Sequence, residues 1–299
     1  MTLARRFREL VLAPEILVLP GIHDALSARI MAQAGFAAAT AGGYSASATL
    51  LAAPDVSLLS LAEMAEQYAR LVEAGGLPLL VDGDTGFGNA SNAVRMVQSF
   101  ERAGVAALFI EDQVFPKRCG HTPGKAVIPA AEMVEKLMAA LDARRDPDMM
   151  IMARTDALAL NGLDDAIERA QLYRQAGADL IFVEALQTPE QMRRVCRVIE
   201  APVLATRMNG GQTPELSAAE FAELGFAALA LPAVATYAVA QTLRRVMTVL
   251  ARDDSDPEIA GHMMDFDEFN ELIGLGDLRA RERDYQDRAG RLAPAADKK

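Results

Sequence analysis

Eight short apolar runs recur along the chain and alternate with longer amphipathic segments. The short runs predict β-strands, and the longer segments predict helices because their apolar residues return every three or four positions. The alternation predicts repeated βα units. The predicted strands are 18–21, 36–41, 77–81, 106–110, 149–153, 180–183, 203–205 and 227–231; the clearest predicted helices are 61–72, 90–103, 131–143, 163–176 and 189–199.

Several predicted helices are followed at once by glycine, at Gly35, Gly104, Gly177 and Gly225, which suits a left-handed helix stop. Continuous apolar strands are typical of parallel sheets that helices cover. Eight βα units in about 250 residues favour a (β/α)8 TIM barrel. A doubly wound open sheet is the alternative, because the same local pattern permits it.

The sequence predicts one catalytic barrel domain over residues 1–252. A polar connection follows, and then an amphipathic helix with apolar residues at Phe266, Phe269 and Leu272. We expect residues 253–290 to form a C-terminal helical extension that packs on the barrel or on a partner subunit. Residues 291–299 are expected to be a flexible tail.

Charge and composition exclude several classes of protein. The net charge of −11 disfavours a nucleic-acid partner. No apolar run reaches the roughly 20 residues of a membrane span. The start of the chain predicts a helix rather than a signal peptide, and only Cys119 and Cys196 are present, too few for a disulfide framework. We therefore expect a cytoplasmic protein without membrane or nucleic-acid partners.

Acidic residues follow four neighbouring predicted strands. In a barrel the carboxyl ends of the strands form the active-site face, so these side chains converge. Several carboxylates without histidine partners favour Mg²⁺, or Mn²⁺, over Zn²⁺. For any single residue, a helix cap or a loop ion pair is the alternative. The charged strand-end residues are Asp82, Asp84, Glu111, Asp112, Arg154, Asp156 and Glu184.

A polar loop follows the fourth predicted strand and contains Cys119 beside Lys117, Arg118 and His121. Cationic neighbours favour the reactive thiolate, so Cys119 is a candidate nucleophile or general acid; an incidental surface thiol is the alternative. Cys196 lies in a predicted helix and is expected to pack. No lysine lies on a predicted strand, which argues against Schiff-base chemistry.

Three motifs, VDGDTGFG (81–88), IEDQVFPKRCGH (110–121) and MARTDA (152–157), occur in this order. Together they resemble the isocitrate lyase/phosphoenolpyruvate mutase superfamily. The KRCGH loop resembles the lyase branch, which includes 2-methylisocitrate lyase, 2,3-dimethylmalate lyase and petal death protein.

This resemblance implies a TIM barrel that binds Mg²⁺, exchanges its last barrel helix between subunits and forms a homotetramer, a dimer of helix-swapped dimers. It implies cleavage of the C2–C3 bond of a 2-hydroxy di- or tricarboxylate to a 2-oxo acid such as pyruvate and a carboxylic acid. The implied residues are Asp82, Asp84 and Glu111 for the metal; Cys119 as general acid, with His121, Lys117, Arg154 and Glu184, for catalysis; and Gly42, Gly43, Tyr44, Asp55, Gly120, Arg154, Thr206 and Asn209 for the substrate.

Two segments depart from the family pattern. Ala41 replaces a serine that holds substrate, and the segment from Thr206 to Asn209 replaces one whose asparagine binds a second carboxylate. These changes leave open an oxaloacetate hydrolase or decarboxylase, a carboxyphosphonoenolpyruvate phosphonomutase, and a non-catalytic binder of small acids.

Overall fold

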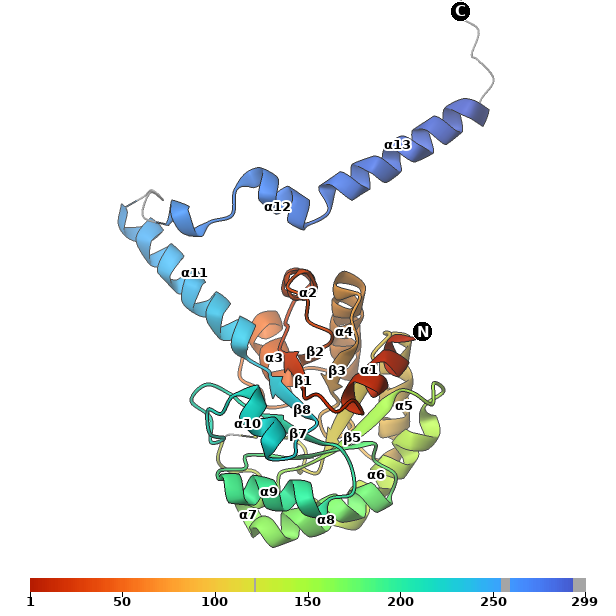
Figure 1. Ribbon diagram of the computed structural model, residues 1–299, viewed down its shortest axis with the longest axis vertical. Helices are drawn as coiled ribbons and strands as arrows, with labels where there is room; N and C mark the ends of the chain where they lie inside the picture. The colour runs from red at the N-terminus through yellow and green to blue at the C-terminus, as the bar shows by residue number, and fades with distance from the viewer. Residues whose placement is uncertain (121, 254–258, 293–299) are drawn as a thin grey trace, which may run out of the picture. The chain divides into compact units, whose positions relative to one another are not determined.

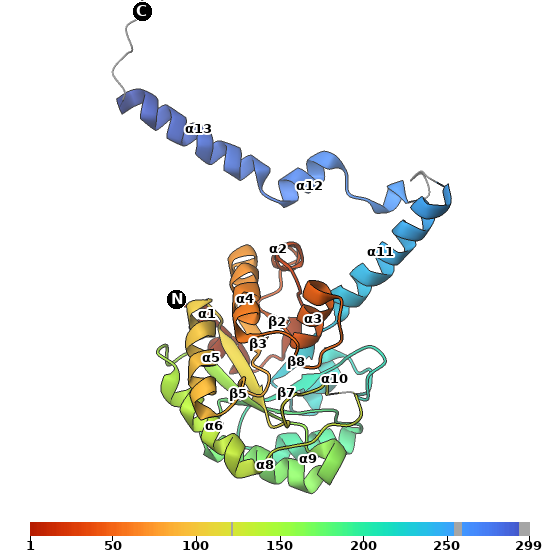
Figure 2. The ribbon, with the colours of Figure 1, turned by 180° about the vertical axis from the view of Figure 1, so that it is seen from behind.

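Eight parallel strands form a barrel in the computed structural model, which describes residues 1–120, 122–253 and 259–292 (Figures 1 and 2). The strands pair in chain order from β2 to β8, and β8 pairs with β1. Gly21 and Thr40 form a single bridge between β1 and β2. The predicted TIM barrel is confirmed, with all eight predicted strands. They are β1 (Leu17–Pro20), β2 (Ala39–Ala41), β3 (Leu79–Asp82), β4 (Ala107–Glu111), β5 (Met150–Thr155), β6 (Leu180–Val183), β7 (Val203–Thr206) and β8 (Ala228–Leu231).

Helices follow the strands and lie outside the barrel (Figure 1). The side chains of Ser60, Asn89 and Thr188 accept backbone N–H groups at three helix starts, which is the usual N-cap interaction. The five helices predicted most clearly are present as α4, α5, α6, α8 and α9. The helices in this part of the chain are α1 (Leu3–Val11), α2 (Ala25–Gln33), α3 (Gly43–Leu51), α4 (Leu61–Gly75), α5 (Ala90–Arg102), α6 (Ala130–Ala143), α7 (Leu158–Asn161), α8 (Leu163–Gln175), α9 (Pro189–Val198), α10 (Ala218–Glu223) and α11 (Val234–Asp253).

The strands are apolar on both faces because both faces are covered. Leu17 and Leu19 of β1 belong to a cluster inside the barrel. Leu108 and Ile110 of β4 belong to a second cluster between the barrel and its helices. Burial on both faces explains why the strands read as continuous apolar runs.

Helix α1 adds apolar side chains to the inner cluster. Its Phe7 and Val11 are buried there with Leu17 and Leu19 of β1. Its N-cap is Thr2, whose side chain accepts the Arg5 N–H. The start of the chain thus forms the predicted helix and helps to fill the barrel interior.

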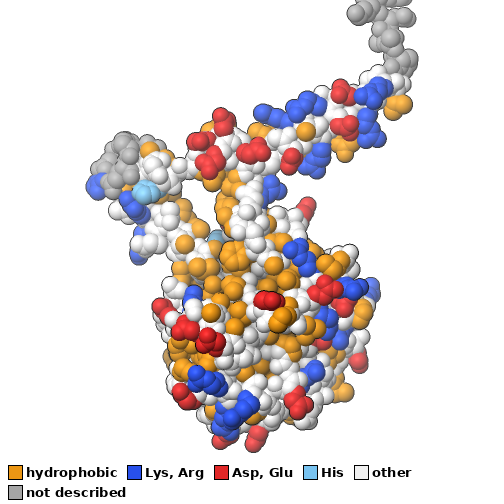
Figure 3. All heavy atoms as spheres, in the orientation of Figure 1, with side chains coloured by type: hydrophobic (Ala, Val, Ile, Leu, Met, Phe, Trp, Pro, Cys, Tyr) orange, Lys and Arg blue, Asp and Glu red, His pale blue; other side chains and the backbone are white. Residues whose placement is uncertain are grey.

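The chain divides into two compact units, Met1–Ala240 and Gln241–Lys299. The second contains the end of α11, a short 3₁₀ helix (Ala260–His262), α12 (Phe266–Leu272) and α13 (Leu275–Leu292). Helix α12 matches the predicted amphipathic helix, whereas α13 was not predicted as a separate helix. The expected connection at 254–258 and most of the expected tail, 293–299, lie outside the described residues. Basic and acidic side chains are interspersed along α13 (Figure 3).

In the part of the chain that the structure describes, no helix combines the length and apolar character needed to cross a membrane.

Phe100 links core packing to the carboxyl end of β3. It is fully buried, and its ring packs edge-on against Tyr68 at a centroid distance of 5.1 Å. The Tyr68 hydroxyl donates to the Asp82 carbonyl oxygen over 2.8 Å. Removal of this ring leaves a cavity beside the strand end.

We expect Phe100→Ala to lower the free energy of unfolding by about 3–5 kcal/mol, because a well-packed core refills such a cavity only in part. Urea denaturation of the purified protein measures this change. Leu12→Ala is the control, since Leu12 is 60% exposed and its loss should cost no more than about 0.5 kcal/mol. Equal midpoints and slopes for the two variants would contradict the prediction.

Candidate active site

Two layers of side chains face inward at the carboxyl ends of neighbouring strands. On each of five strands an apolar residue is followed two positions later by a polar one, and a step of two keeps both on the same face. The lower layer belongs to the core, while the upper layer carries the reactive groups. The pairs are Leu80 and Asp82 on β3, Phe109 and Glu111 on β4, Met152 and Arg154 on β5, Phe182 on β6 with Glu184 directly after it, and Leu204 and Thr206 on β7.

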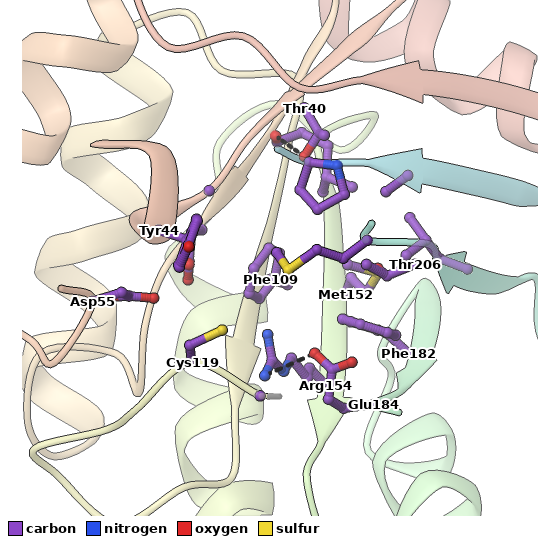
Figure 4. Close-up of a pocket in the computed structure, with 18 residues that line it drawn as sticks. Thr40, Tyr44, Asp55, Phe109, Cys119, Met152, Arg154, Phe182, Glu184 and Thr206 are labelled. Carbon is purple, nitrogen blue, oxygen red and sulfur yellow. Dashed lines mark hydrogen bonds and ion pairs between the residues drawn. The ribbon is translucent and has the colours of Figure 1, made fainter. Parts of the chain in front are cut away.

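A cavity opens above the apolar layer (Figure 4). Tyr44 and Asp55 lie on one side of it, and Phe182 and Thr206 on the other. The sulfur of Cys119 points into the space between them. The site residues predicted from the sequence that line this cavity are Gly42, Tyr44, Asp55, Asp82, Cys119, Gly120, Arg154, Glu184 and Thr206.

A buried lysine lies among the carboxylates on one side of the cavity. Lys117 Nζ is 2.8 Å from Asp55 Oδ2, 3.0 Å from Asp84 Oδ1 and 3.6 Å from Asp82 Oδ2. All four side chains are buried. The cation therefore offsets the mutual repulsion of three carboxylates that are largely shielded from water.

The protonation of this cluster reflects both burial and charge. Burial raises the pKa of Asp84 to about 6, although Lys117 opposes the shift. Burial also disfavours the charged form of Lys117, but the surrounding carboxylates outweigh it and hold the pKa of this lysine well above its ordinary value. Lys117 is accordingly a permanent cation.

Gly43 brings the start of α3 against this cluster. Its N–H donates to Asp82 Oδ2 over 2.9 Å. A Cβ atom at Gly43 would lie 3.0 Å from Asp82 Oδ2 and 3.2 Å from Lys117 Nζ, so a larger residue would crowd the cluster. The N-terminus of a helix also attracts anions, and the neighbouring Gly42 lines the cavity.

Arg154 forms the second charged centre. Asp156 accepts two hydrogen bonds from its guanidinium, over 2.8 and 3.1 Å. Glu184 Oε2 lies 2.9 Å from Arg154 Nη2, and Glu111 Oε2 lies 3.3 Å from Arg154 Nε. The guanidinium also lies over the Phe182 ring, 5.2 Å from its centroid. These contacts fix the orientation of Arg154 at the edge of the cavity.

Burial raises the pKa of Glu111 well above its usual range, and Arg154 only partly opposes this. The pKa of Asp156 is lowered: burial acts against ionisation, but the charges and hydrogen bonds of Arg154 and Lys125 outweigh it. The surroundings therefore favour the ionised form of Asp156 and disfavour the ionised form of Glu111.

Behind Arg154, Asp112 organises a hydrogen-bond network. It accepts the hydroxyl groups of Thr155 and Tyr173, each over 2.8 Å, and the Asp156 N–H over 2.9 Å. Arg169 Nη1 lies 3.2 Å from its Oδ2. Asp112 is fully buried, and it holds the backbone of the residue that orients Arg154.

The loop that carries Cys119 is tied to both charged centres. Lys117 enters the carboxylate cluster, and Lys125 donates to the Gly120 carbonyl oxygen and, over 2.8 Å, to Asp156 Oδ1. A Cβ atom at Gly120 would overlap with Arg154 Nη2 and Glu184 Oε2. Glycine is thus needed for the loop to lie against Arg154.

Two predicted residues are placed away from the cavity lining, and a third is not described. The Lys117 ammonium forms its ion pairs with the carboxylate cluster. Asn209 is exposed and lines a second, smaller pocket with Arg207 and Tyr237. His121 lies outside the described residues.

The sequence interpretation gave no role to Lys125, and it noted Asp112 and Asp156 only as strand-end acids. The alternation along β4 and β5 carried a signal for Asp156, because it lies two positions after Arg154. The pairing of Lys125 with Asp156 joins residues 31 positions apart. No local pattern would have revealed it.

The donor set fits a hard divalent cation. Asp84 Oδ1 and both carboxylate oxygens of Glu111 are buried and accept no hydrogen bond, although Lys117 and Arg154 form ion pairs with these two side chains. Oxygen donors of this kind suit Mg²⁺. Within the described residues, no three His, Cys, Asp or Glu side chains are gathered as a metal-holding group in the present arrangement, in which Lys117 lies among the acids. Asp82, Asp84 and Glu111 are the residues that would hold the ion.

Sequence comparison places the chain among known enzymes. The family described as phosphoenolpyruvate phosphomutase matches residues 7–251. The 2,3-dimethylmalate lyase of Eubacterium barkeri is 42% identical over 285 residues, which cover 95% of this chain and 99% of that protein. The 2-methylisocitrate lyase of Bacillus subtilis is 41% identical, over 94% of this chain and 92% of that protein.

Solved structures agree with the sequence comparison. The crystal structure of a 2,3-dimethylmalate lyase matches with a TM-score of 0.89 and 32% identity, over 96% of this chain and 95% of that one. A phosphonopyruvate hydrolase in complex with oxalate and Mg²⁺ matches with a TM-score of 0.87 and 29% identity, over 96% of this chain and all of that one. With its motifs, barrel and site in agreement, the chain belongs to the isocitrate lyase/phosphoenolpyruvate mutase superfamily of enzymes.

Proposed function

We propose that the protein is a Mg²⁺-dependent carbon–carbon lyase. Its substrate is a 2-hydroxy di- or tricarboxylate, which it cleaves between C2 and C3 to a 2-oxo acid such as pyruvate and a carboxylic acid. The observation that carries this proposal is the arrangement of one cavity between a carboxylate cluster suited to a metal, a fixed arginine and a thiol. The lyases among the relatives support the same reaction class.

The carboxylate cluster and Arg154 would each bind a different part of the complex of metal and substrate. Asp82, Asp84 and Glu111 would hold Mg²⁺, which when bound supplies Lewis-acid stabilisation of negative charge on the C2 oxygen. Gly42 and Gly43, at the start of α3, would bind the carboxylate next to C2 through the helix N-terminus. Arg154, held in place by Asp156 and Glu184, would bind the same carboxylate.

Cys119 is placed to donate a proton to the departing acid. The C2 hydroxyl gives its proton to a base, for which Tyr44 at the cavity is the candidate by position, and C2 becomes the carbonyl carbon of the 2-oxo acid. As the C2–C3 bond breaks, its electrons pass to the departing acid, which leaves as an enediolate and must take up a proton at carbon. The thiol of Cys119 points into the cavity (Figure 4) and would donate that proton. His121 belongs to the same loop, and we retain it as an expected contributor.

We expect EDTA treatment to abolish release of the 2-oxo acid and added Mg²⁺ to restore it, because the proposed reaction needs Lewis-acid stabilisation of negative charge on the C2 oxygen. A coupled assay for 2-oxo acids measures the release. Mn²⁺ should also restore activity, since it accepts the same ligands. Undiminished turnover after exhaustive chelation would contradict metal dependence.

We expect Cys119→Ser to lose about 10²- to 10⁴-fold in kcat, the usual contribution of a positioned proton donor, while Mg²⁺ still binds. Steady-state kinetics and calorimetric titration with Mg²⁺ provide the two measurements. Cys196→Ala is the matched control, because this second thiol lies in α9 and burial raises its pKa to about 12. Full activity of Cys119→Ser would remove the thiol from the mechanism.

Three other activities would be recognised by their products. Oxalate released from oxaloacetate identifies a hydrolase, and pyruvate with CO₂ identifies a decarboxylase. Rearrangement of a carboxyphosphonate identifies a phosphonomutase. Saturable binding of small acids with no turnover identifies a non-catalytic binder.

We also propose that residues 1–252 are the catalytic barrel and that 253–290 serve assembly into a homotetramer by helix exchange. Exposed apolar side chains support this, since Phe266 is 82% and Tyr285 64% exposed, and such surface commonly marks an interface. A cytoplasmic location belongs to the same proposal and is supported by two thiols that form no disulfide. The net charge of −11 supports the lack of a nucleic-acid partner.

Light scattering coupled to size exclusion should give four times the chain mass of 32.1 kDa. Phe266→Asp combined with Phe269→Asp should shift the population to smaller species, because both rings are exposed in the single chain. Arg288→Ala on α13 is a control without a change in apolar surface. A wild-type monomer at micromolar concentration would refute the proposed assembly.

A further inference from the structure

A buried lysine outside the cavity has no role in the proposed reaction. Lys136 is on α6, and only 5% of its surface is exposed. On the same face of the helix, Met133, Leu137 and Ala140 are buried in the apolar core. The ion pair of Lys136 is long and lies at the surface, since Glu132 Oε1 is 3.5 Å from its Nζ and the Glu132 side chain is 48% exposed. Burial of an ammonium group away from water is unfavourable, so packing alone does not explain its position.

The Lys136 ammonium reaches the backbone of the turn that carries Asp84. Its Nζ donates to the Thr85 carbonyl oxygen over 3.2 Å, and both residues are buried. Thr85 directly follows Asp84, which is one of the proposed Mg²⁺ ligands. The hydrogen bond therefore links α6 to the backbone beside a metal ligand.

The backbone of Asp84 lies in the left-handed region and needs support from its surroundings. Its φ is 47°, a conformation that costs a residue with a Cβ free energy and persists where surrounding contacts hold it. The Gly86 N–H donates to the Gly83 carbonyl oxygen over 2.9 Å. The Glu111 N–H donates to the Asp84 carbonyl oxygen over the same distance. Lys136 adds a further contact to this turn, from a helix outside the barrel.

From these contacts, and resting on the proposed dependence on Mg²⁺, we infer that Lys136 is a positioning residue for the metal site. It holds the Thr85 carbonyl group and thereby keeps the Asp84 carboxylate where the cation would bind. Lys136 does not itself line the cavity. Residues that support a metal ligand from behind commonly govern the affinity for the metal, and their loss lowers it about 10- to 100-fold.

Charge and positioning predict opposite effects when Lys136 is replaced by a neutral residue. A buried positive charge so close to the turn repels Mg²⁺, so removal of the charge alone would tighten metal binding. Loss of the hydrogen bond to Thr85 frees the turn and would weaken metal binding. The sign of the change in Mg²⁺ affinity therefore separates a positioning residue from a charge that is merely nearby.

Lys136→Met tests this role, because methionine keeps an unbranched apolar side chain and removes the donor. Calorimetric titration of the metal-free variant with Mg²⁺ should give a dissociation constant at least about tenfold above that of the wild type. An unchanged or lower dissociation constant would overturn the inference and leave the lyase function intact. A wild-type protein that binds no Mg²⁺ would instead overturn the metal dependence on which the inference rests.

Steady-state kinetics add a readout that a purely structural role would not move. In Lys136→Met, the Mg²⁺ concentration for half-maximal release of the 2-oxo acid should rise at least about tenfold. At saturating Mg²⁺, kcat should stay within about threefold of the wild-type value, because the lost interaction acts on binding of the metal. A loss of kcat that saturating Mg²⁺ does not restore would overturn the positioning role.

Glu132→Gln is the matched control, because it removes the exposed partner of Lys136 and leaves the lysine in place. Its Mg²⁺ affinity should equal that of the wild type, and a loss as large as that of Lys136→Met would overturn the inference. Urea denaturation shows whether each variant is folded at the temperature of the titration. If Lys136→Met does not fold, the shorter and polar Lys136→Gln provides the same test, with the same expected loss of affinity.

Discussion

Six carboxylates share the mouth of the barrel because three cations are buried among them. Each lysine and the arginine contacts at least one acid that water does not reach, so the loss of one cation would leave a buried charge without a partner. Breaking such a pair commonly costs several kcal/mol. The arrangement of the loop around Cys119 depends on the same charges, because Lys117 and Lys125 both belong to it.

The apolar framework gives these charges their positions. Phe100 supports Tyr68, whose hydroxyl holds the carbonyl of Asp82 at the end of β3. Asp112 holds the N–H of Asp156, and Asp156 in turn orients Arg154. Neither Phe100 nor Asp112 lines the cavity. They act as positioning residues, through backbone groups that local packing fixes.

The strands were predictable because burial on both faces leaves a strong pattern. The motif residues were also predictable as a set, since each follows a strand end. The ion-pair partner of each charged side chain was not predictable from the sequence. Lys117 precedes Cys119 by two residues in sequence, yet its ammonium lies with Asp55, 62 positions away. Contacts of this kind depend on the path of the loop, and sequence spacing does not specify it.

Other differences have similar physical causes. Helix α13 falls within the helical extension expected over 253–290, but it was not predicted as a separate helix, and none of its described residues is buried. The family resemblance implies a substrate contact for Asn209, which is exposed and lines the second pocket, and this role stays a prediction. Lys125 was assigned no role from the sequence because its partner, Asp156, lies 31 positions away.

The alternation of Met152 with Arg154, and of Leu204 with Thr206, has a consequence for how such enzymes diversify. On each strand one position sets the shape of the cavity floor and the next inward position supplies the chemistry. The hydrogen bonds between neighbouring strands join backbone groups and do not depend on the side chain at either position. Floor residues that do not contact Arg154, such as Leu204, can therefore change the shape of the cavity without changing the residues that carry the chemistry.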